Sequence, residues 1–175
     1  MKDKKYFPRS KKPSSQASKS NDGPKRYNFQ EQVGFLLRKA YQSHSLLFQR
    51  MCPDPQLTTA QFAVLCALRD RGACSLTDIG RAVVMDPATT RGIVGRLKER
   101  KLVSLANDSV DRRRMVVDLN DRGRALLASI IPRATAITEA TLEPLNAVER
   151  VALLHLLSKL APNGEVNAAI SSQDA

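Results

Sequence analysis

Residues 75–101 read SLTDIGRAVVMDPATTRGIVGRLKERK, and this stretch decides the fold of the chain. Ser75, with Asp78 three residues later, is typical of a helix N-terminus, because both side chains can bond backbone N–H groups that the first turn leaves unpaired. Asp86 and Pro87 indicate a second start, since aspartate is favoured at the N-cap and proline at the first helical position. The two helices are short and almost no linker separates them. The stretch therefore predicts a helix-turn-helix.

The second predicted helix has two sides of different character. One side is mostly apolar and is expected to face the core. The other side is small, polar and basic, and small residues allow the major groove of DNA to approach closely. An ordinary solvent-exposed helix face is the alternative interpretation of that side. The inward residues are Thr90, Ile93, Val94 and Leu97, and the outward residues are Ala88, Thr89, Arg91, Gly92 and Gly95.

A predicted hairpin follows this helix directly. The segments LVSLA and RRMVVDL flank a polar turn, which favours two antiparallel strands. On the second strand Met115, Val117 and Leu119 share one side and are expected to cover the core. Arg113 lies one step beyond them, at the exposed tip. A hairpin in this position is a wing beside the recognition helix.

The tip of the predicted wing carries three consecutive arginines, which no core can use. Arginines there can enter the narrow, strongly negative minor groove next to the major groove that the helix occupies. Asp111 is expected to hold Arg113 in position by an ion pair, because a free arginine side chain would lose more entropy on binding. The pattern predicts a winged helix-turn-helix that binds DNA.

Four stretches of the chain together resemble the MarR family of winged-helix bacterial transcription regulators. They are LTTAQFAVLCAL, SLTDIGRAVVMDPATTRGIVGRLKERKLV, DSVDRRRMVVDLNDRGRAL and LNAVERVALLHLLSKL, and the resemblance covers about residues 30 to 161. The wing motif D-x-R, here Asp111, Arg112 and Arg113, followed by Leu119 and Gly123, is specific in that context.

The resemblance implies that the arginine matching Arg113 enters the minor groove and that helix positions matching Thr89, Arg91 and Arg96 meet DNA. Lys101 departs from the family, which commonly has glycine at this position, and we expect the departure to reshape the turn without removing DNA binding. The candidate DNA-binding residues are Thr89, Thr90, Arg91, Arg96, Arg112 and Arg113, with Asp111 orienting Arg113.

Long helical patterns flank the predicted winged unit. One runs over residues 29–51, another bends at Pro132, and a last one begins at Asn146. They expose more apolar surface than the small winged unit can cover, so we expect a homodimer in which the first, fifth and sixth helices interlock, as in the family. A dimer also lets two recognition helices meet half-sites one helical turn apart.

The predicted fold is therefore mainly α, with three helices and a two-stranded β wing forming the winged helix-turn-helix. We expect residues 57–119 to be the DNA-binding domain. Residues 29–56 and 120–175 are expected to form a helical dimerisation region, and residues 1–28 a disordered basic tail.

The first predicted helix carries a stripe of Leu37, Tyr41, His44 and Phe48 at spacings of three and four. One interpretation is a core stripe with a hydrogen-bonded histidine. The other is an effector pocket between the dimerisation helices and the winged unit, where the family binds its ligands. The stretch FLLRKAYQSHSLLF is similar to the first helix of MarR-type regulators of aromatic-acid catabolism, which implies an aromatic carboxylate or its coenzyme A thioester as effector. The candidate effector-binding residues are Arg38, Tyr41, His44, Phe48 and Phe62.

The charge of the chain is strongly basic and uneven. The formal net charge is +11, and residues 1–28, with nine basic and two acidic side chains, account for +7 of it. Such a balance favours an anionic partner, such as nucleic acid or an acidic membrane surface. The basic tail is either a solvated extension or an arm that follows DNA phosphates. It lacks the apolar segment of a signal peptide, and FAVLCAL, the longest apolar run, is far too short to cross a bilayer, so we expect a cytoplasmic protein.

Other classes of protein find little support in the sequence. It contains no Gly-rich phosphate loop and no G-x-S-x-G or H-E-x-x-H motif, so we expect no catalytic activity and no cofactor. The three cysteines, Cys52, Cys66 and Cys74, match neither a disulfide framework nor a zinc site. A cysteine-based redox-sensing repressor is the main alternative function, although residues 29–51 lack the first-helix cysteine of the peroxide-sensing MarR branch. A sequence-independent architectural DNA-binding protein is the other alternative.

Overall fold

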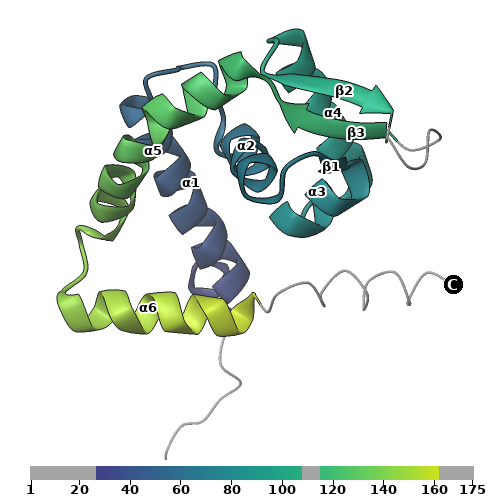
Figure 1. Cartoon of the computed structure of the whole chain (residues 1–175). Coiled ribbons are helices and arrows are strands. Elements are labelled where there is room, and N and C mark those ends of the chain that lie inside the picture. Colours follow the sequence, from purple (N-terminus) through teal and green to yellow (C-terminus); the bar gives the residue numbers. More distant parts are fainter. Residues whose placement is uncertain (1–26, 108–114, 162–175) are drawn as a thin grey trace, which may run out of the picture.

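The computed structural model describes residues 27–107 and 115–161 of the 175-residue chain. These residues form six α-helices and one small antiparallel sheet (Figure 1). The mainly α fold with a β hairpin, as predicted, is confirmed. The order along the chain is η1 Phe29–Glu31, α1 Val33–Met51, α2 Thr59–Arg71, β1 Cys74–Ser75, α3 Leu76–Val83, α4 Pro87–Glu99, β2 Val103–Asn107, β3 Met115–Leu119, α5 Asp121–Leu142 and α6 Ala147–Leu160.

Helices α2, α3 and α4 begin at capping side chains, and the caps Ser75 and Asp86 agree with the prediction from the sequence. The Thr58 side chain accepts from the backbone N–H of Gln61, whose side chain in turn accepts from the N–H of Thr58, which completes a capping box before α2. Ser75 accepts from the N–H of Asp78 at the start of α3, and Asp86 accepts from the N–H of Thr89 at the start of α4. The predicted helix-turn-helix is therefore formed by α3 and α4.

The sheet has the strand order β1-β3-β2, so the hairpin gains a third strand that was not predicted. Within the hairpin Val103 pairs with Leu119 and Asn107 pairs with Met115. The short strand β1 joins the other edge of β3, where Cys74 pairs with Val117. This third strand ties the start of α3 to the base of the wing.

The core lies between α2, α4 and the sheet. The four residues predicted to face inward on α4, which are Thr90, Ile93, Val94 and Leu97, are all buried, and the predicted outward residues are all exposed. Val117 and Leu119 are buried as expected, whereas Met115 is 44% exposed. The prediction for Met115 is wrong because this residue begins β3 at the far end of the hairpin, beyond the core.

Helix α4 ends in a Schellman motif. The backbone N–H of Lys101 donates to the carbonyl of Lys98, and the N–H of Leu102 donates to the carbonyl of Leu97. This closure requires a left-handed residue, and Lys101 adopts a φ of 56°. Immediately beyond, a Cβ atom at Gly123 would lie 2.0 Å from the Leu102 carbonyl oxygen, so α5 can approach the end of α4 only with glycine there.

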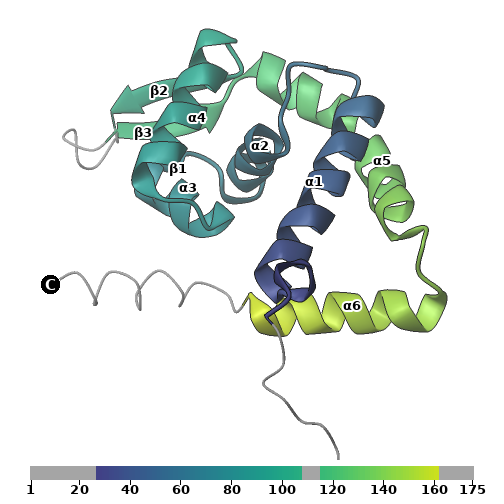
Figure 2. The same ribbon diagram turned by 180° about the vertical axis from the view of Figure 1, so that it is seen from behind.

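Helices α1, α5 and α6 enclose a triangle beside the winged unit, as two opposite views show (Figures 1 and 2). Leu127, Ile130 and Ile137 of α5 are buried, and the helix continues through Pro132. Helix α6 buries none of its residues, and its apolar side chains Val151 and Leu154 are 70% and 54% exposed. In the described part of the chain, no helix combines the length and the apolar character that crossing a membrane would require.

Candidate nucleic-acid interface and ligand cavity

The outward side of α4 presents Thr89, Arg91 and Arg96 to solvent. Gly92 and Gly95 lie on the same side and have no side chains that project from the helix. A Cβ atom at Gly95 would meet nothing within 4 Å, and one at Gly92 would meet only the end of the Arg96 side chain at 3.7 Å. A basic surface without bulky side chains is what a helix needs to enter a major groove.

The start of α4 is held by its N-cap. Hydrogen bonds from the Thr89 side chain and backbone lower the pKa of the Asp86 carboxyl, so the cap carries its charge over a wider pH range than a free aspartate. Thr90 is fully buried and its hydroxyl donates to the Asp86 carbonyl at 2.9 Å. This agrees with the prediction that Thr90 faces inward. It does not agree with Thr90 as a candidate DNA-binding residue, because the buried side chain is not part of the DNA-facing surface.

The turn between α3 and α4 is tightly packed. A Cβ atom at Gly80 would lie 3.0 Å from the Met85 carbonyl oxygen and 3.1 Å from the Thr90 hydroxyl oxygen. Val84, at the end of α3, has a φ of 53°, an unusual conformation for a β-branched residue. The close approach at Gly80 and this bend fix the angle at which α4 leaves α3.

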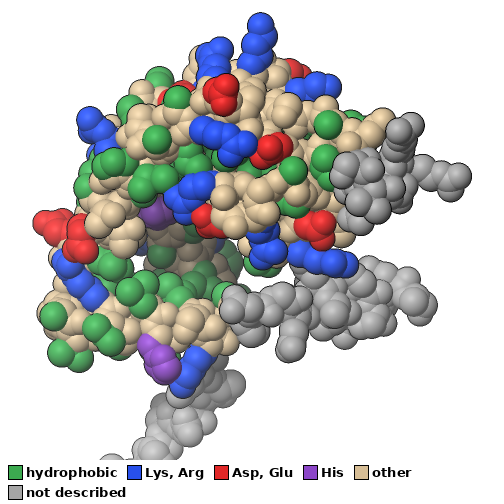
Figure 3. Space-filling view, in the orientation of Figure 1, with side chains coloured by type: hydrophobic (Ala, Val, Ile, Leu, Met, Phe, Trp, Pro, Cys, Tyr) green, Lys and Arg blue, Asp and Glu red, His purple; other side chains and the backbone are tan. Residues whose placement is uncertain are grey.

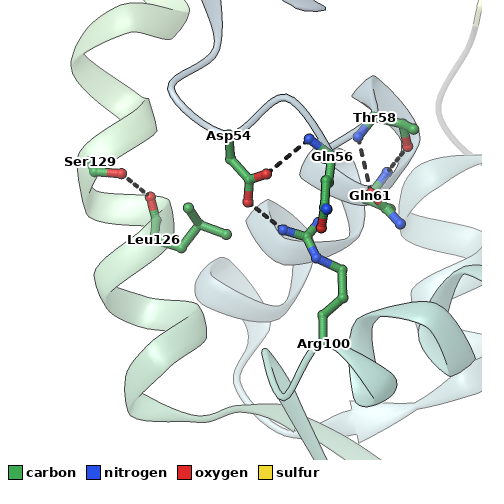
Figure 4. Close-up of polar contacts among 7 residues, drawn as sticks. All are labelled: Asp54, Gln56, Thr58, Gln61, Arg100, Leu126 and Ser129. Carbon is green, nitrogen blue, oxygen red and sulfur yellow. Dashed lines mark hydrogen bonds and ion pairs between the residues drawn. The ribbon is translucent and has the colours of Figure 1, made fainter.

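An ion pair joins the end of α4 to the loop that follows α1. Arg100, which caps the C-terminus of α4, donates to the Asp54 carboxylate, and the backbone N–H of Gln56 donates to the same group at 3.0 Å (Figure 4). Both charged side chains are largely shielded from solvent, with 22% and 17% exposed. Sequence reasoning missed this link, since no local spacing connects the two residues.

The tip of the predicted wing lies outside the described residues. Asp111, Arg112 and Arg113 therefore keep the roles predicted from the sequence and have no structural description here. The paired residues Asn107 and Met115 mark where the described strands stop.

A cavity of about 500 Å³ lies between α1, α2 and α5. Four of the five candidate effector-binding residues line it, whereas Arg38 is exposed on α1 and does not. Val83 and Met85, beside the turn of the helix-turn-helix, also contribute to the wall. The lining comprises Tyr41, His44, Phe48, Thr59, Ala60, Phe62, Ala63, Cys66, Val83, Met85, Ala134, Ile137 and Thr138.

The cavity is lined by both aromatic and hydrogen-bonding side chains. Phe48 and Phe62 contact each other with ring centroids 5.4 Å apart, and Phe48 is only 2% exposed. Tyr41 and His44 are polar and more accessible. The Tyr41 hydroxyl shares a hydrogen bond of 2.9 Å with the Thr59 hydroxyl, and His44 Nδ1 lies 3.0 Å from the Thr141 hydroxyl. The stripe on α1 therefore combines both interpretations: Phe48 belongs to the core and Tyr41 with His44 faces the cavity.

A second cavity, of about 640 Å³, adjoins the first and shares Tyr41, His44 and Thr138 with it. It lies between α1, α5 and α6 and is lined mainly by leucines and other apolar side chains. The space-filling view shows the hollow between α6 and the body of the protein, with hydrophobic side chains along it (Figure 3).

The cysteines are poorly suited to thiolate chemistry. Burial is the largest effect on all three, and it raises the pKa of Cys52, Cys66 and Cys74. Redox-sensing cysteines instead require a lowered thiol pKa. No group of three potential metal ligands occurs within residues 27–107 and 115–161.

Comparison with known proteins shows which family the chain resembles in sequence. Residues 56–114 match the family model described as MarR family. The transcriptional repressor NicR of Pseudomonas putida is 52% identical over 139 residues, which cover 79% of this chain and 88% of NicR.

Two solved structures are also similar over most of the chain. BpsR of Bordetella bronchiseptica, whose DNA binding is regulated by 6-hydroxynicotinic acid, is 52% identical, with a TM-score of 0.73 over 80% of this chain and 99% of BpsR. PcaV of Streptomyces coelicolor, in complex with its natural ligand, is 29% identical, with a TM-score of 0.71 over 77% of this chain and 95% of PcaV.

Proposed function

The chain belongs to the MarR family of transcriptional regulators, and from this premise we propose that it is an effector-responsive repressor. It binds a pseudo-palindromic operator as a homodimer. A small anionic aromatic effector, an aromatic acid or its coenzyme A thioester, releases it from DNA.

The DNA-binding half of the proposal assigns the major groove to α4 and the minor groove to the wing. The exposed side of α4 supports the first assignment, because Thr89, Arg91 and Arg96 lie there beside Gly92 and Gly95. Arg112 and Arg113, with Asp111 orienting Arg113, are proposed for the minor groove. Residues 57–119 form the proposed DNA-binding domain.

The homodimer is supported by the helices that flank this domain. Several apolar side chains of α1 and α6 are half exposed or more in the single chain, including Val33, Leu36, Leu154 and Leu160. Apolar patches of this extent on a folded chain mark interaction surfaces. We assign residues 29–56 and 120–175 to the dimerisation region.

The cavity between α1, α2 and α5 is the observation that supports the proposal of an effector. Its volume of about 500 Å³ is in the usual range of small-molecule sites. The Phe48 and Phe62 rings offer apolar surface for an aromatic ring, and Tyr41 and His44 offer hydrogen-bonding groups in the same cavity. BpsR, which is 52% identical, is regulated by an acid of this kind.

The position of the cavity supplies a route for the response. An effector releases DNA only if it binds better to the conformation whose two recognition helices are wrongly spaced. Val83 and Met85 line the cavity and flank the turn that sets the direction of α4. A ligand against them would therefore bias that direction, with a typical coupling free energy of about 1–3 kcal/mol.

A thermal-shift titration tests the effector assignment. A ligand that binds only the folded state stabilises it by about 2.7 kcal/mol when present at 100 times its Kd, so the melting temperature rises. We expect 6-hydroxynicotinic acid, another aromatic acid, or a coenzyme A thioester of such an acid to raise the melting temperature of the full-length protein. Failure of every aromatic acid and thioester to do so would contradict the effector half of the proposal.

A further inference from the structure

Thr141 lies near the end of α5. Its hydroxyl oxygen lies 2.8 Å from the Ile137 carbonyl oxygen and 3.0 Å from His44 Nδ1. A carbonyl oxygen can only accept, so the first contact uses the single hydrogen of the hydroxyl group. Helical threonines commonly form this bond to the carbonyl four residues earlier.

The second contact must then use a hydrogen of the imidazole. Thr141 has no further hydrogen to give, so His44 donates from Nδ1 and the threonine oxygen accepts. In the neutral imidazole one ring nitrogen carries the hydrogen and the other carries a lone pair. With hydrogen on Nδ1, the lone pair is on Nε2.

The Nε2 atom is available to a ligand. It has no hydrogen-bond partner among the described residues, and it is not enclosed in the core, since His44 is only half-buried and lines both cavities. In the neutral side chain this atom meets an incoming molecule as a hydrogen-bond acceptor.

We propose that Thr141 is a positioning residue of the effector site, which fixes the Nδ1–H tautomer of His44 and thereby makes Nε2 an acceptor for the effector. The contact selects molecules that present a donor there, such as a ring hydroxyl or a ring N–H. A carboxylate at the same place would meet a lone pair, so the acid group of the effector lies elsewhere in the cavity. The selection of a ligand rests on the proposed function, but the tautomer does not.

The tautomer is measured without any ligand. Nitrogen-15 NMR of the full-length protein labelled at histidine distinguishes a ring nitrogen that carries hydrogen from one with a lone pair. The His155→Gln substitution on exposed α6 removes the only other histidine signal. Spectra are recorded at alkaline pH, where the two neutral tautomers are compared.

His44 is expected to carry hydrogen on Nδ1 both in the wild type and in the Thr141→Ser variant, because threonine and serine at position 141 both have a hydroxyl group. Thr141→Val has nearly the same shape but no acceptor, and we expect it to move the hydrogen to Nε2. Hydrogen on Nε2 in the wild type, or an unchanged tautomer in Thr141→Val, would overturn the proposal.

Calorimetric titration tests the selection. The wild type should bind 6-hydroxynicotinic acid about tenfold more tightly than the same acid without its 6-hydroxyl group, the fold-change expected for one hydrogen bond. Thr141→Ser should keep this preference and Thr141→Val should lose it. If Thr141→Val keeps the full preference, the selective role of Thr141 is wrong. If the wild type binds neither acid, the selective role of Thr141 is overturned and the proposal of an aromatic acid as effector fails as well. The NMR result still decides which tautomer His44 adopts.

Discussion

Lys101 holds a backbone conformation that usually belongs to glycine. Its φ of 56° is required because the Schellman motif at the end of α4 closes only through a left-handed residue. For a residue with a Cβ atom this conformation costs roughly 1–2 kcal/mol. The glycine that the resemblance to the family implies at this position therefore has a steric cause, and lysine adopts the same conformation at a cost in stability.

We expect Lys101→Gly to raise the free energy of unfolding by about 1 kcal/mol, because relief of the strain exceeds the greater entropy of glycine in the unfolded chain. Chemical denaturation of the full-length protein measures the change. Lys98→Gly is the matched control, since Lys98 lies within α4, and it should lower the free energy by about 1 kcal/mol. A Lys101→Gly variant no more stable than the wild type would contradict the strain at this position.

The sequence predicted at residue level those features that are local. The caps Ser75 and Asp86 depend on neighbours three residues away, so spacing alone reveals them. The pairing of Arg100 with Asp54 and of His44 with Thr141 depends on how distant segments fold together. These partners could not be predicted, because a single sequence holds no local signal for them.

At the scale of elements, α4 combines an inner side packed against the core with an outer side where glycines leave no bulky side chains. Gly95 has open space around it in the protein, so its small size is not required for folding. Glycine within a helix instead lowers stability by about 1 kcal/mol relative to alanine. We infer that close approach of DNA is the reason for glycine at this position.

Gly95→Ala is therefore expected to raise the stability of the protein by about 1 kcal/mol and to weaken operator binding. Denaturation and fluorescence anisotropy with labelled operator DNA measure the two effects. Ser129→Ala, at an exposed position of α5, is the control, because it improves helix propensity away from α4 and should leave DNA affinity unchanged. Unchanged affinity in Gly95→Ala would show that this part of α4 does not meet the groove.

The elements were predicted well where the pattern was long and less well where it was short. The helices follow from apolar periodicity and caps. Strand β1 has only two residues and exists through its pairing with β3, so it carries no periodicity of its own. Met115 follows the alternation of its strand, yet it is exposed because the core ends before the hairpin does.

At the scale of the whole molecule, α6 is incomplete in a single chain. No residue of α6 is buried, and Leu154 lines the apolar cavity between α1, α5 and α6. We expect Leu154→Glu to convert a dimer into a monomer, because a carboxylate would be buried against leucines at the interface. Sedimentation velocity measures the mass. Val84→Asn, at a similarly exposed apolar residue at the end of α3, should remain dimeric. A monomeric wild type, or a dimeric Leu154→Glu variant, would contradict the assignment of this surface.

The basic tail makes a separate prediction about salt. Each phosphate contact adds about 0.9 to the slope of log affinity against log salt. If residues 1–28 follow DNA phosphates, their deletion flattens this slope and leaves the preference for operator unchanged. A variant with its nine basic tail residues changed to glutamine should behave as the deletion does. The same slope in all three proteins would mean that the tail is a solvated extension.

The central claim is that one molecule couples sequence-specific DNA binding to an effector in the cavity around His44. Footprinting on the DNA upstream of the protein's own coding sequence, with and without 6-hydroxynicotinic acid, tests this claim most directly. We expect the wild type to protect a pseudo-palindrome and to release it when the acid is added. We expect His44→Ala to protect the same site and to hold it at that concentration of acid, whereas His155→Ala should respond as the wild type does. Uniform coating of the DNA, or equal release of wild type and His44→Ala, would contradict the account.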